Sequence, residues 1–402
     1  MNVQAAPPPA TLSLQALVEG YTDPHGLYDA LRERDRISYD PVGRCWLVTG
    51  HDAVRSLLSD ARFVSEAPAA PRPNAPRRRS FISDSVQRQI VFRDGPDQLR
   101  AARAVLTELS RRADALTQPL RDAAFTLAER ARARSQVDVV KEFAVPFSMQ
   151  AICMILGLPV ADDAEMERLE RWSTTYADVT SGYLEVELEE IVLLGDYMRA
   201  QVEARGGVPS DDLIGAFMHD GGFQDPEDLV INCMMAFAAG RVTTQKLLGN
   251  GIPLLLPEWG AWRDAVRQNP ALTRRLGDEL LRLVTPTRYL VRFAAEDVEL
   301  EGGATIRRDT KVVLVLQAAY RDPAAFGCPL ALEGARTPNP HVAFGFGPHR
   351  CPGASIARLE VQTALQALLE TLTELHPHPA AAPAWEPNPN IGGYASYRCL
   401  CG

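Results

Sequence analysis

The sequence predicts a mainly α-helical fold with small β-sheets. Beyond residue 95, apolar residues recur at three- and four-residue spacing over most of the chain, which is the period of helices with one buried face. Strand signals are confined to short runs near residues 37–48 and 289–315. With 402 residues, of which 46% are hydrophobic, the chain can bury one large core. We therefore expect a Pro- and Ala-rich, disordered start over residues 1–12 and a single domain over residues 13–402.

Net charge and cysteine content exclude several classes of protein. The net charge of −9 argues against nucleic acid as a partner, because binding its phosphates requires a basic surface. The sequence has no uninterrupted apolar run of about 18 residues and no charged-then-apolar leader, so we expect no membrane insertion and a cytoplasmic protein. Seven cysteines without regular spacing favour reduced thiols over a disulfide framework. The pair Cys399 and Cys401 lacks a second pair of metal ligands, so we interpret it as structural.

The individual elements follow from local patterns. Short strands are expected at residues 37–39 and 45–48, with a helix after Gly50. The stretch from Ser65 to Arg93 is rich in Pro, Arg and Ser and too long for an ordinary connection, so we interpret it as a binding loop. Further helices are expected over residues 96–133, 141–158, 163–172 and 184–204, and further strands over residues 289–300 and 311–315.

One helix differs from the others because its first half is apolar on all sides. It begins at Asp225-Pro226, where an N-cap aspartate and a first-turn proline agree, and it is expected to break near Pro253. Such a helix is buried through the middle of a fold. It contains Ala239-Gly240-Arg241-Val242-Thr243-Thr244, in which a glycine and two threonines are poor helix formers. From these residues alone, a harmless kink and a functional groove are equally good interpretations of the segment.

The most informative segment is VAFGFGPHRCPGASIARLE, residues 342–360. Three of its residues are glycines, Gly345, Gly347 and Gly353. Glycines permit backbone conformations that other residues avoid, and they allow a flat cofactor to approach closely. Cys351 lies where a helix begins, and the positive end of that helix favours the thiolate. An apolar stripe at positions 361, 365, 368, 372 and 375 supports the helix itself. The segment predicts a metal-bound thiolate, with His349 and Arg350 placed to neutralise carboxylates at the edge of the cofactor.

The run Phe344-Gly345-Phe346-Gly347-Pro348-His349-Arg350-Cys351-Pro352-Gly353 resembles the haem-binding loop of the cytochrome P450 superfamily, bacterial soluble type. Other resemblances occur in the order and spacing of the family and cover about residues 13–400. Glu279-Leu280-Leu281-Arg282 resembles its buried Glu-x-x-Arg ion pair, and Arg292 matches an arginine used on a haem propionate. Ala239-Gly240-x-x-Thr243 resembles the groove in which the family activates dioxygen.

This resemblance implies a triangular haem-thiolate prism that binds haem b (heme, iron protoporphyrin IX). Cys351 is expected to be the axial iron ligand. The residues expected to take part in catalysis are Gly240, Thr243 and Thr244. The other expected cofactor contacts are Ala239, Arg292, Phe344, Gly345, His349 and Gly353. The expected structural ion pair is Glu279 and Arg282. The expected substrate pocket includes Met235, Arg241, Val242, Leu290, Val291 and Tyr394.

The chain departs from the family pattern in two places. Where the family has an acid before the groove threonine, this chain has Val242, which cannot carry a proton. Water held by Thr243 and Thr244, a polar group of the substrate, or Arg241 acting through ordered water must then substitute. Arginine does not release its proton, so Arg241 can only orient a relay or bind a substrate carboxylate. A surface-facing Arg241 is the alternative.

The second departure lies in DGPDQLRAAR, residues 94–103. Gln98 and Ala102 replace a histidine and an arginine that contact haem propionates in the family. Arg100 and Arg103 are out of register and are not assigned this role. The anchoring of the haem is therefore expected to depend more on the histidine and the arginine at positions 349 and 292.

The resemblance implies an oxidoreductase, a P450 monooxygenase that activates dioxygen for hydroxylation or a related C–H oxidation of a small molecule. We expect a tailoring step in bacterial secondary-metabolite or antibiotic biosynthesis, on a substrate that is free or tethered to a carrier protein. Electrons are expected from NAD(P)H through a ferredoxin reductase and an acidic ferredoxin that docks near Arg350 and Arg358. The chain is expected to be a monomer. Two alternatives stay open: ring formation, desaturation or coupling without oxygen insertion, and a catalytically silent scaffold that activates a partner enzyme.

Overall fold

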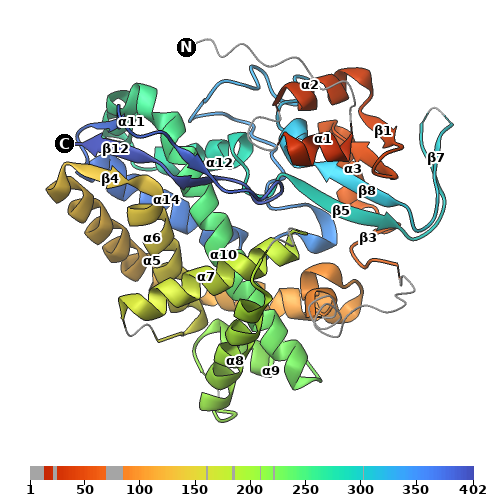
Figure 1. Cartoon of the computed structure of the whole chain (residues 1–402), viewed down its shortest axis with the longest axis horizontal. Helices are drawn as coiled ribbons and strands as arrows, with labels where there is room; N and C mark the ends of the chain where they lie inside the picture. The colour runs from red at the N-terminus through yellow and green to blue at the C-terminus, as the bar shows by residue number, and fades with distance from the viewer. Residues whose placement is uncertain are drawn as a thin grey trace.

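The structure, a computed structural model, describes residues 13–20, 25–68, 85–159, 162–182, 186–208, 210–220, 222–301 and 303–402. It confirms the expected fold class, because helices dominate the described residues and the described strands form small sheets. The outline in Figure 1 is roughly triangular and narrows toward α8 (Leu188–Ala204) and α9 (Leu213–His219). The start expected to be disordered, residues 1–12, and the middle of the expected binding loop, residues 69–84, lie outside the described residues.

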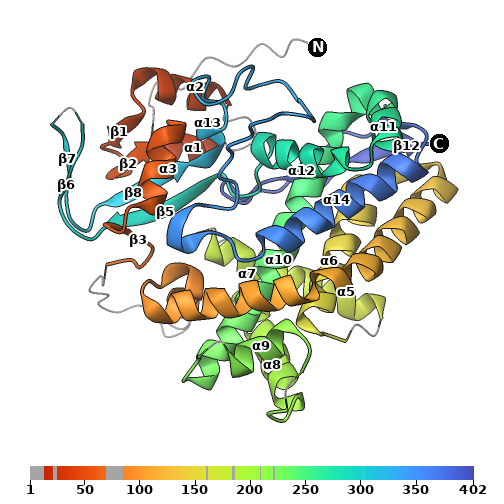
Figure 2. The same cartoon turned by 180° about the vertical axis from the view of Figure 1, so that it is seen from behind.

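A strand-rich region lies beside the helical bulk (Figures 1 and 2). Its elements are α1 (Leu14–Glu19), α2 (His25–Arg34), β1 (Ile37–Asp40), β2 (Cys45–Val48), α3 (His51–Ser59), β3 (Phe63–Val64), β5 (Tyr289–Ala294), β6 (Val298–Glu299), β7 (Thr305–Ile306), β8 (Lys311–Val315) and α13 (Leu316–Ala319). The main sheet has the order β1-β2-β8-β5-β3, with β8 parallel to β2 and antiparallel to β5. Four of the five residues of β8 are buried, as expected for a central strand that is covered on both faces.

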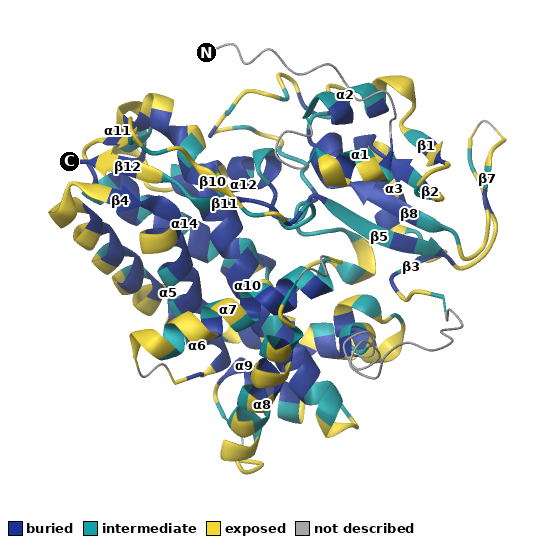
Figure 3. Ribbon diagram, in the orientation of Figure 1, coloured by how far each residue is buried: buried dark blue, intermediate teal, exposed yellow. Residues whose placement is uncertain are grey.

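The helical bulk contains η1 (Ile90–Phe92), α5 (Pro96–Arg134), η2 (Val139–Ala144), α6 (Val145–Leu156), α7 (Asp163–Thr180), α10 (Pro226–Leu255), η3 (Leu256–Glu258), α11 (Trp259–Gln268), α12 (Leu272–Leu283), η4 (Gly347–His349) and α14 (Ala354–Thr371). Its short strands are β4 (Gln136–Asp138), β9 (Leu375–Pro377), β10 (Ala384–Trp385), β11 (Tyr394–Ser396) and β12 (Arg398–Cys401). α10 crosses the middle of the molecule in both views and packs against α6, α7, α8 and α14. Figure 3 shows that it is largely buried, as its apolar first half predicts.

Some helix boundaries differ from those expected. α7 continues to Thr180 instead of ending at residue 172. The hydroxyls that break the apolar pattern in its second half are satisfied inside the protein, and Ser173 Oγ donates to the Leu169 carbonyl oxygen at 2.7 Å. α10 continues past Pro253 to Leu255. α14 ends at Thr371, so the last residues of the predicted stripe lie beyond it, in the chain that leads into β9.

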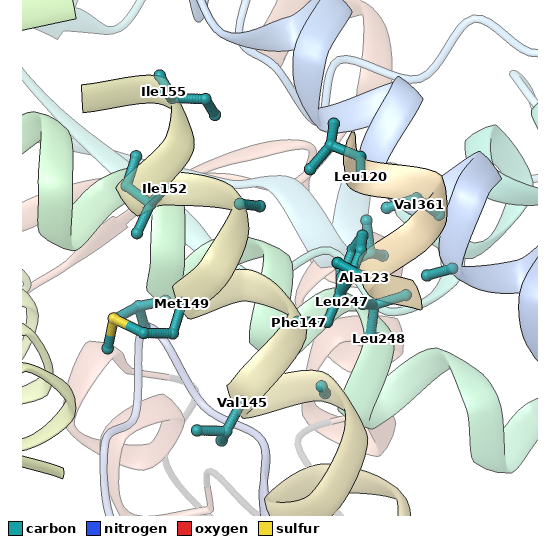
Figure 4. Packing of buried hydrophobic residues seen from close by; sticks show 14 of the residues in the cluster. Leu120, Ala123, Val145, Phe147, Met149, Ile152, Ile155, Leu247, Leu248 and Val361 are labelled. Atoms are coloured by element: carbon teal, nitrogen blue, oxygen red, sulfur yellow. The ribbon is translucent and has the colours of Figure 1, made fainter. Parts of the chain in front are cut away.

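The largest hydrophobic cluster joins α5, α6, α10 and α14. In Figure 4, Leu120 of α5, Phe147 of α6, Leu247 of α10 and Val361 of α14 lie close together in it. Within the described residues, one stretch, Val139–Leu156, is long and apolar enough to cross a membrane, with a mean hydropathy of 1.5. Because 72% of that stretch is buried inside the protein, its apolar composition is explained by core packing.

Glu279 and Arg282 form a buried ion pair in α12. Arg282 donates to the two carboxylate oxygens at 2.8 and 2.6 Å, and to the Tyr320 carbonyl oxygen at 3.0 Å. Arg336 donates to the same carboxylate at 3.0 Å. Burial alone would raise the pKa of Glu279, but hydrogen bonds from Arg282, the Glu333 backbone and Arg336 outweigh it and hold the pKa below its ordinary value. The cluster ties α12 to the segment that leads into the cysteine loop.

Candidate functional site

Cys351 lies in a loop between η4 and α14. Its backbone N–H donates to the Phe344 carbonyl oxygen at 2.7 Å, which closes the loop. Gly345 and Gly347 have φ angles of 72° and 73°, in the left-handed region that favours glycine. A Cβ at Gly347 would also lie 2.5 Å from the Leu58 carbonyl oxygen. The loop therefore keeps its shape only with glycine at this position.

The Cys351 side chain retains accessible surface. Burial nevertheless raises the pKa of its thiol, and the Gly353 backbone N–H, Arg350 and Arg358 only partly oppose this effect. A helix N-terminus lowers the pKa of a nearby thiol, but α14 begins only at Ala354, beyond Cys351. The opposite effect of burial on the pKa of Cys351 is therefore larger. A bound metal cation would restore the thiolate, so the thiol fits the role of a metal ligand.

α10 presents a narrow accessible stripe in a helix that is otherwise largely buried. Ala239 is exposed, and Gly240 and Thr243 are partly exposed, whereas Val242 and Thr244 are buried. The helix is continuous here, so the glycine and threonines do not interrupt it. Thr243 Oγ1 donates to the Ala239 carbonyl oxygen at 2.7 Å, which leaves its lone pairs free to accept a hydrogen bond. The stripe thus combines two small residues with one available hydroxyl oxygen.

Gly240 also has a packing role that the sequence did not reveal. A Cβ at this position would lie 2.6 Å from Cδ1 of Ile152 on α6. The absence of a side chain at Gly240 therefore leaves room for the end of the Ile152 side chain between α10 and α6.

Glu360 is a site residue that sequence reasoning missed. It lies on α14, and its carboxyl accepts a hydrogen bond from Thr244 Oγ1 at 2.5 Å. Burial raises the pKa of Glu360 to about 7, and the hydrogen bond from Thr244 acts in the opposite direction. Glu360, Ala364 and Ala367 lie on the same buried face of α14. A carboxyl among small residues on one helix face is the sequence signal that would have identified Glu360.

Arg292, His349 and Asp94 form a second polar group. Arg292 is 7% exposed and donates to the Val291 carbonyl oxygen at 2.8 Å, but it forms no ion pair with any residue that the structure describes. His349 Nε2 lies 2.7 Å from Asp94 Oδ1. Burial lowers the pKa of both Arg292 and His349, and Asp94 opposes this effect. A buried guanidinium without a carboxylate partner fits the site of an anionic group such as a haem propionate.

The start of α5 does not supply a further cation to this group. Gln98 Nε2 is within 3.4 Å of the Pro348 carbonyl oxygen, and Ala102 has no polar side chain. Arg100 donates to Asp97 at 2.8 Å with half of its side chain exposed, and Arg103 is exposed. Neither arginine compensates for the missing histidine and arginine.

The two arginines expected near a docked ferredoxin differ in availability. Arg350 is exposed. Arg358 donates to Asp278 at 2.7 Å, and its guanidinium lies 4.6 Å from the centre of the Phe344 ring. Arg358 is therefore already neutralised and packed, and Arg350 is the more accessible charge.

The residues expected in the substrate pocket fall into two groups. Leu290, Val291 and Tyr394 are partly exposed, whereas Met235 and Val242 are buried. Position 242 is turned about 60° from position 239 and about 100° from position 243, so it lies at the edge of the stripe, where its side chain is buried. The structure therefore does not place Met235 or Val242 on an accessible surface.

Arg241 lines neither a pocket nor the surface, because its side chain is 0% exposed. Its guanidinium donates to Gln245 Oε1 at 2.6 Å and to Thr174 Oγ1 on α7. Burial lowers the pKa of Arg241 to about 10, and Glu170, Glu386 and Asp178 oppose this effect. Position 241 is turned about 200° from position 239, so its side chain faces α7 and not the accessible stripe.

Comparisons with known proteins identify the family of this chain. The family model for cytochrome P450 matches residues 265–383. The 20-oxo-5-O-mycaminosyltylactone 23-monooxygenase of Streptomyces fradiae is 32% identical over 359 residues, which cover 87% of this chain and 83% of that protein. Mycinamicin IV hydroxylase/epoxidase of Micromonospora griseorubida is 33% identical over 373 residues, with coverages of 88% and 90%. The solved structure of P450BioI with an acyl carrier protein ligated to hexadec-9Z-enoic acid matches with a TM-score of 0.85 and 26% identity, covering 96% of this chain and 100% of that chain.

The fold and the glycine-rich cysteine loop define a haem-thiolate oxidoreductase. The chain belongs to the cytochrome P450 family and is a P450 monooxygenase-type enzyme. Family membership implies a haem iron held by a thiolate and chemistry that depends on dioxygen. The names of the relatives describe oxygen insertion, which disfavours both the non-oxygenating reactions and the silent scaffold.

Proposed function

We propose that Cys351 binds the iron of haem b and that a small organic substrate is oxidised between Cys351 and the accessible stripe of α10. One observation carries this assignment: the glycine-dependent loop closes on Cys351 through its backbone hydrogen bond to Phe344 and leaves the Cys351 thiol accessible. When bound, the haem supplies the two-electron oxidation of a substrate by dioxygen. The protein residues determine binding, orientation and the supply of protons.

Several residues have the chemistry to hold the haem. Arg292 and His349 can pair with its propionates, because Arg292 has no carboxylate partner among the described residues and His349 lies in the same electrostatic group. Ala239 and Gly345 leave room for a flat ring system. The remaining loop residues assigned to the haem are Phe344 and Gly353.

The threonines of α10 have different roles. Thr243 Oγ1 can accept a hydrogen bond from water or from an oxygen-bearing ligand, since its own hydrogen is bonded to the Ala239 carbonyl. Thr244 is buried and bonded to Glu360, so it positions that carboxyl and does not contact a ligand. Gly240 supports the stripe through its packing against α6.

The reaction that we infer is hydroxylation or a related C–H oxidation in the tailoring of a bacterial secondary metabolite. The two relatives named above are a monooxygenase that acts on 20-oxo-5-O-mycaminosyltylactone and a hydroxylase/epoxidase that acts on mycinamicin IV, and their similarity extends over most of this chain. Leu290, Val291 and Tyr394 would supply apolar and aromatic contacts to such a substrate. The similarity to P450BioI in complex with a loaded acyl carrier protein supports a carrier-tethered substrate as a second candidate.

The expected partners are a ferredoxin and its NAD(P)H-dependent reductase. Arg350, exposed next to Cys351, is the positive charge best placed to attract an acidic ferredoxin. We propose a monomeric, cytoplasmic enzyme in which residues 13–402 form one catalytic domain.

Turnover with a surrogate ferredoxin and reductase tests this function. The purified holoenzyme is supplied with NADPH, air and a panel of macrolactones, macrolides and acyl carrier proteins loaded with fatty acids. We expect a product heavier by one oxygen atom, and ¹⁸O from labelled dioxygen in that product. Product without label would contradict oxygen insertion, and a correctly folded holoenzyme that oxidises no member of the panel would favour the scaffold.

A further inference from the structure

Lysine is rare in this chain, and one of the few lysines is buried next to the site. Of 42 basic side chains, only Lys141, Lys246 and Lys311 are lysine, and all others are arginine. Lys141 is exposed and Lys311 is half-buried in β8, whereas Lys246 is 2% exposed in the middle of α10. Arginine is the usual choice for a permanent buried charge, because it keeps its proton; a buried lysine can release one.

Lys246 lies beside the position where the groove lacks an acid. It is four residues beyond Val242 and three beyond Thr243 on the same helix. Side chains at these spacings are neighbours on a helix surface, with Cβ atoms roughly 5–6 Å apart, so one water molecule can bridge from the ammonium to the Thr243 hydroxyl.

The Lys246 ammonium is paired with a carboxylate from a distant part of the chain. Glu386 follows β10, and one of its carboxylate oxygens contacts Lys246 Nζ. The turn lies against the lysine, since a Cβ at Gly393 would lie 2.9 Å from Lys246 Cδ. Nζ makes no hydrogen bond of normal geometry within the described residues, so the ammonium has N–H groups to direct elsewhere.

The charges that face Lys246 come from three elements. Glu386 comes from the β10–β11 turn, Arg241 from α10 itself and Asp178 from α7; Arg241 is in turn faced by Glu170 of α7. Burial lowers the pKa of Lys246, which Arg241 reinforces and Glu386 and Asp178 oppose. The Glu386 side chain is 21% exposed, so this pair joins a buried ammonium on α10 to a carboxylate that meets solvent.

We propose that Glu386 and Lys246 pass protons from solvent to Thr243 and so replace the acid that position 242 lacks. This proposal rests on the proposed oxygenation. Oxygenation of a substrate RH follows RH + O₂ + 2e⁻ + 2H⁺ → ROH + H₂O, with single electrons from the ferredoxin. For each proton, the Lys246 ammonium donates to a water at Thr243 and becomes an amine. The Glu386 carboxylate, which is partly exposed, then takes up one proton from solvent and passes it to the amine, which restores the ammonium–carboxylate pair.

Glu360 is the competing source of protons, and the structure favours Glu386. Glu360 is 3% exposed and, within the described part of the chain, its carboxyl is hydrogen-bonded by Thr244 alone. It can therefore store a proton but has no visible connection to solvent. Glu386 is partly exposed and is already linked to a group next to Thr243.

Dioxygen stoichiometry without any organic substrate tests this route. The holoenzyme is supplied with NADPH, a surrogate ferredoxin and its reductase. Release of hydrogen peroxide consumes one NADPH per dioxygen, O₂ + NADPH + H⁺ → H₂O₂ + NADP⁺. Full reduction consumes two, O₂ + 2NADPH + 2H⁺ → 2H₂O + 2NADP⁺. When proton delivery is slow, peroxide leaves before its O–O bond is cleaved, so the ratio of peroxide to dioxygen rises.

The variants separate proton transfer from structural support. Lys246→Arg keeps the charge and its pairing with Glu386 but cannot release a proton, so we expect water formation to fall about 10- to 100-fold, as in Lys246→Met and Glu386→Gln. Glu386→Asp should restore most of the activity, and the exposed Lys141→Arg is the matched control with no effect. A Lys246→Arg enzyme that forms water like the wild type would overturn the route. So would a loss confined to Glu360→Gln.

A second readout does not depend on turnover. With [ε-¹³C]lysine, the ferrous carbonyl holoenzyme has three lysine side chains to resolve by NMR, and Lys246 is assigned by its loss in Lys246→Arg. We expect Lys246 to titrate below the ordinary lysine value, and lower still in Glu386→Gln. Titration at the ordinary value, unchanged by Glu386→Gln, would contradict the route. The carbonyl spectrum recorded on the same samples reports the Cys351 ligation separately, so a failure of the proposed function is recognised independently.

Discussion

Arg292 is the residue that we propose for the anion-binding edge of the site. The side chain is buried, and among the described residues its charge has no carboxylate partner. Leaving such a cation buried is costly unless an anion completes the pair. A bound propionate would do so, and this role gives the residue a measurable effect on cofactor retention.

We expect Arg292→Leu to release haem faster than the wild type. Loss of a hydrogen bond to a charged group is worth about 1.5–3 kcal/mol, which corresponds to about a 10- to 100-fold faster transfer of haem to apomyoglobin. Arg103→Leu, which removes an exposed arginine from α5, is the matched control and should release haem at the wild-type rate. Equal effects of the two substitutions would remove Arg292 from the propionate site.

Glu360 is a second residue whose environment predicts a measurable property, the dependence of stability on pH. Its pKa is raised from 4.5 to about 7 in the folded protein, mainly by burial. Below pH 4.5 both states are protonated and the residue has no effect. Between pH 4.5 and 7 the unfolded state ionises first, so folding becomes less favourable as pH rises, by about 3 kcal/mol at most.

The substitution Glu360→Gln removes this titration and keeps an acceptor for Thr244. We expect the variant to gain thermal stability relative to the wild-type holoenzyme as pH rises from 5 to 7.5, with the difference levelling off above that. The measurement is the unfolding midpoint of both proteins across this pH range. A difference that is constant with pH would show that Glu360 is ionised in the folded protein.

At the scale of elements, the cysteine loop depends on one glycine against α3. A side chain at Gly347 would meet the Leu58 carbonyl at 2.5 Å and would have to adopt a φ of 73°. Because the clash is with backbone, a flexible side chain cannot relieve it. We expect Gly347→Ala to lower stability by about 2–3 kcal/mol and to reduce haem content, measured by denaturation and by the haem-to-protein absorbance ratio.

Gly260 in α11 is the matched control for this substitution. A Cβ there meets nothing within 4 Å, and the backbone is helical, so Gly260→Ala should leave stability unchanged or raise it slightly. If Gly347→Ala retained wild-type stability and haem content, the cysteine loop would not need the conformation that glycine provides.

The elements were predicted best where local chemistry is strong. The N-cap aspartate and first-turn proline located the start of α10 correctly, and β2 and β8 were found at their observed bounds. The end of α7 was missed because buried Ser173 and Thr175 break the apolar pattern there. Their hydroxyls are satisfied inside the protein, by the Leu169 carbonyl and by Glu190, which the sequence does not reveal.

At the scale of the whole molecule, the sequence located the cysteine loop and the central helix, but not the pairs that form across the fold. Lys246 meets Glu386, Thr244 meets Glu360 and Arg241 meets Thr174 through tertiary packing alone. Each pair joins residues that are far apart in the chain, so no local pattern predicts them. The same packing explains why Arg241, which sequence reasoning left between pocket and surface, belongs to neither.

The visible spectrum of the dithionite-reduced carbonyl complex tests the central assignment most directly. The wild-type protein should show the red-shifted Soret band of a thiolate-bound haem. Cys351→Ser should lose that band, while the exposed Cys328→Ser, as a matched control, should keep it. A colourless wild-type protein after expression with ample haem precursor, or a thiolate-type band that persists in Cys351→Ser, would contradict the assignment of Cys351 as the iron ligand.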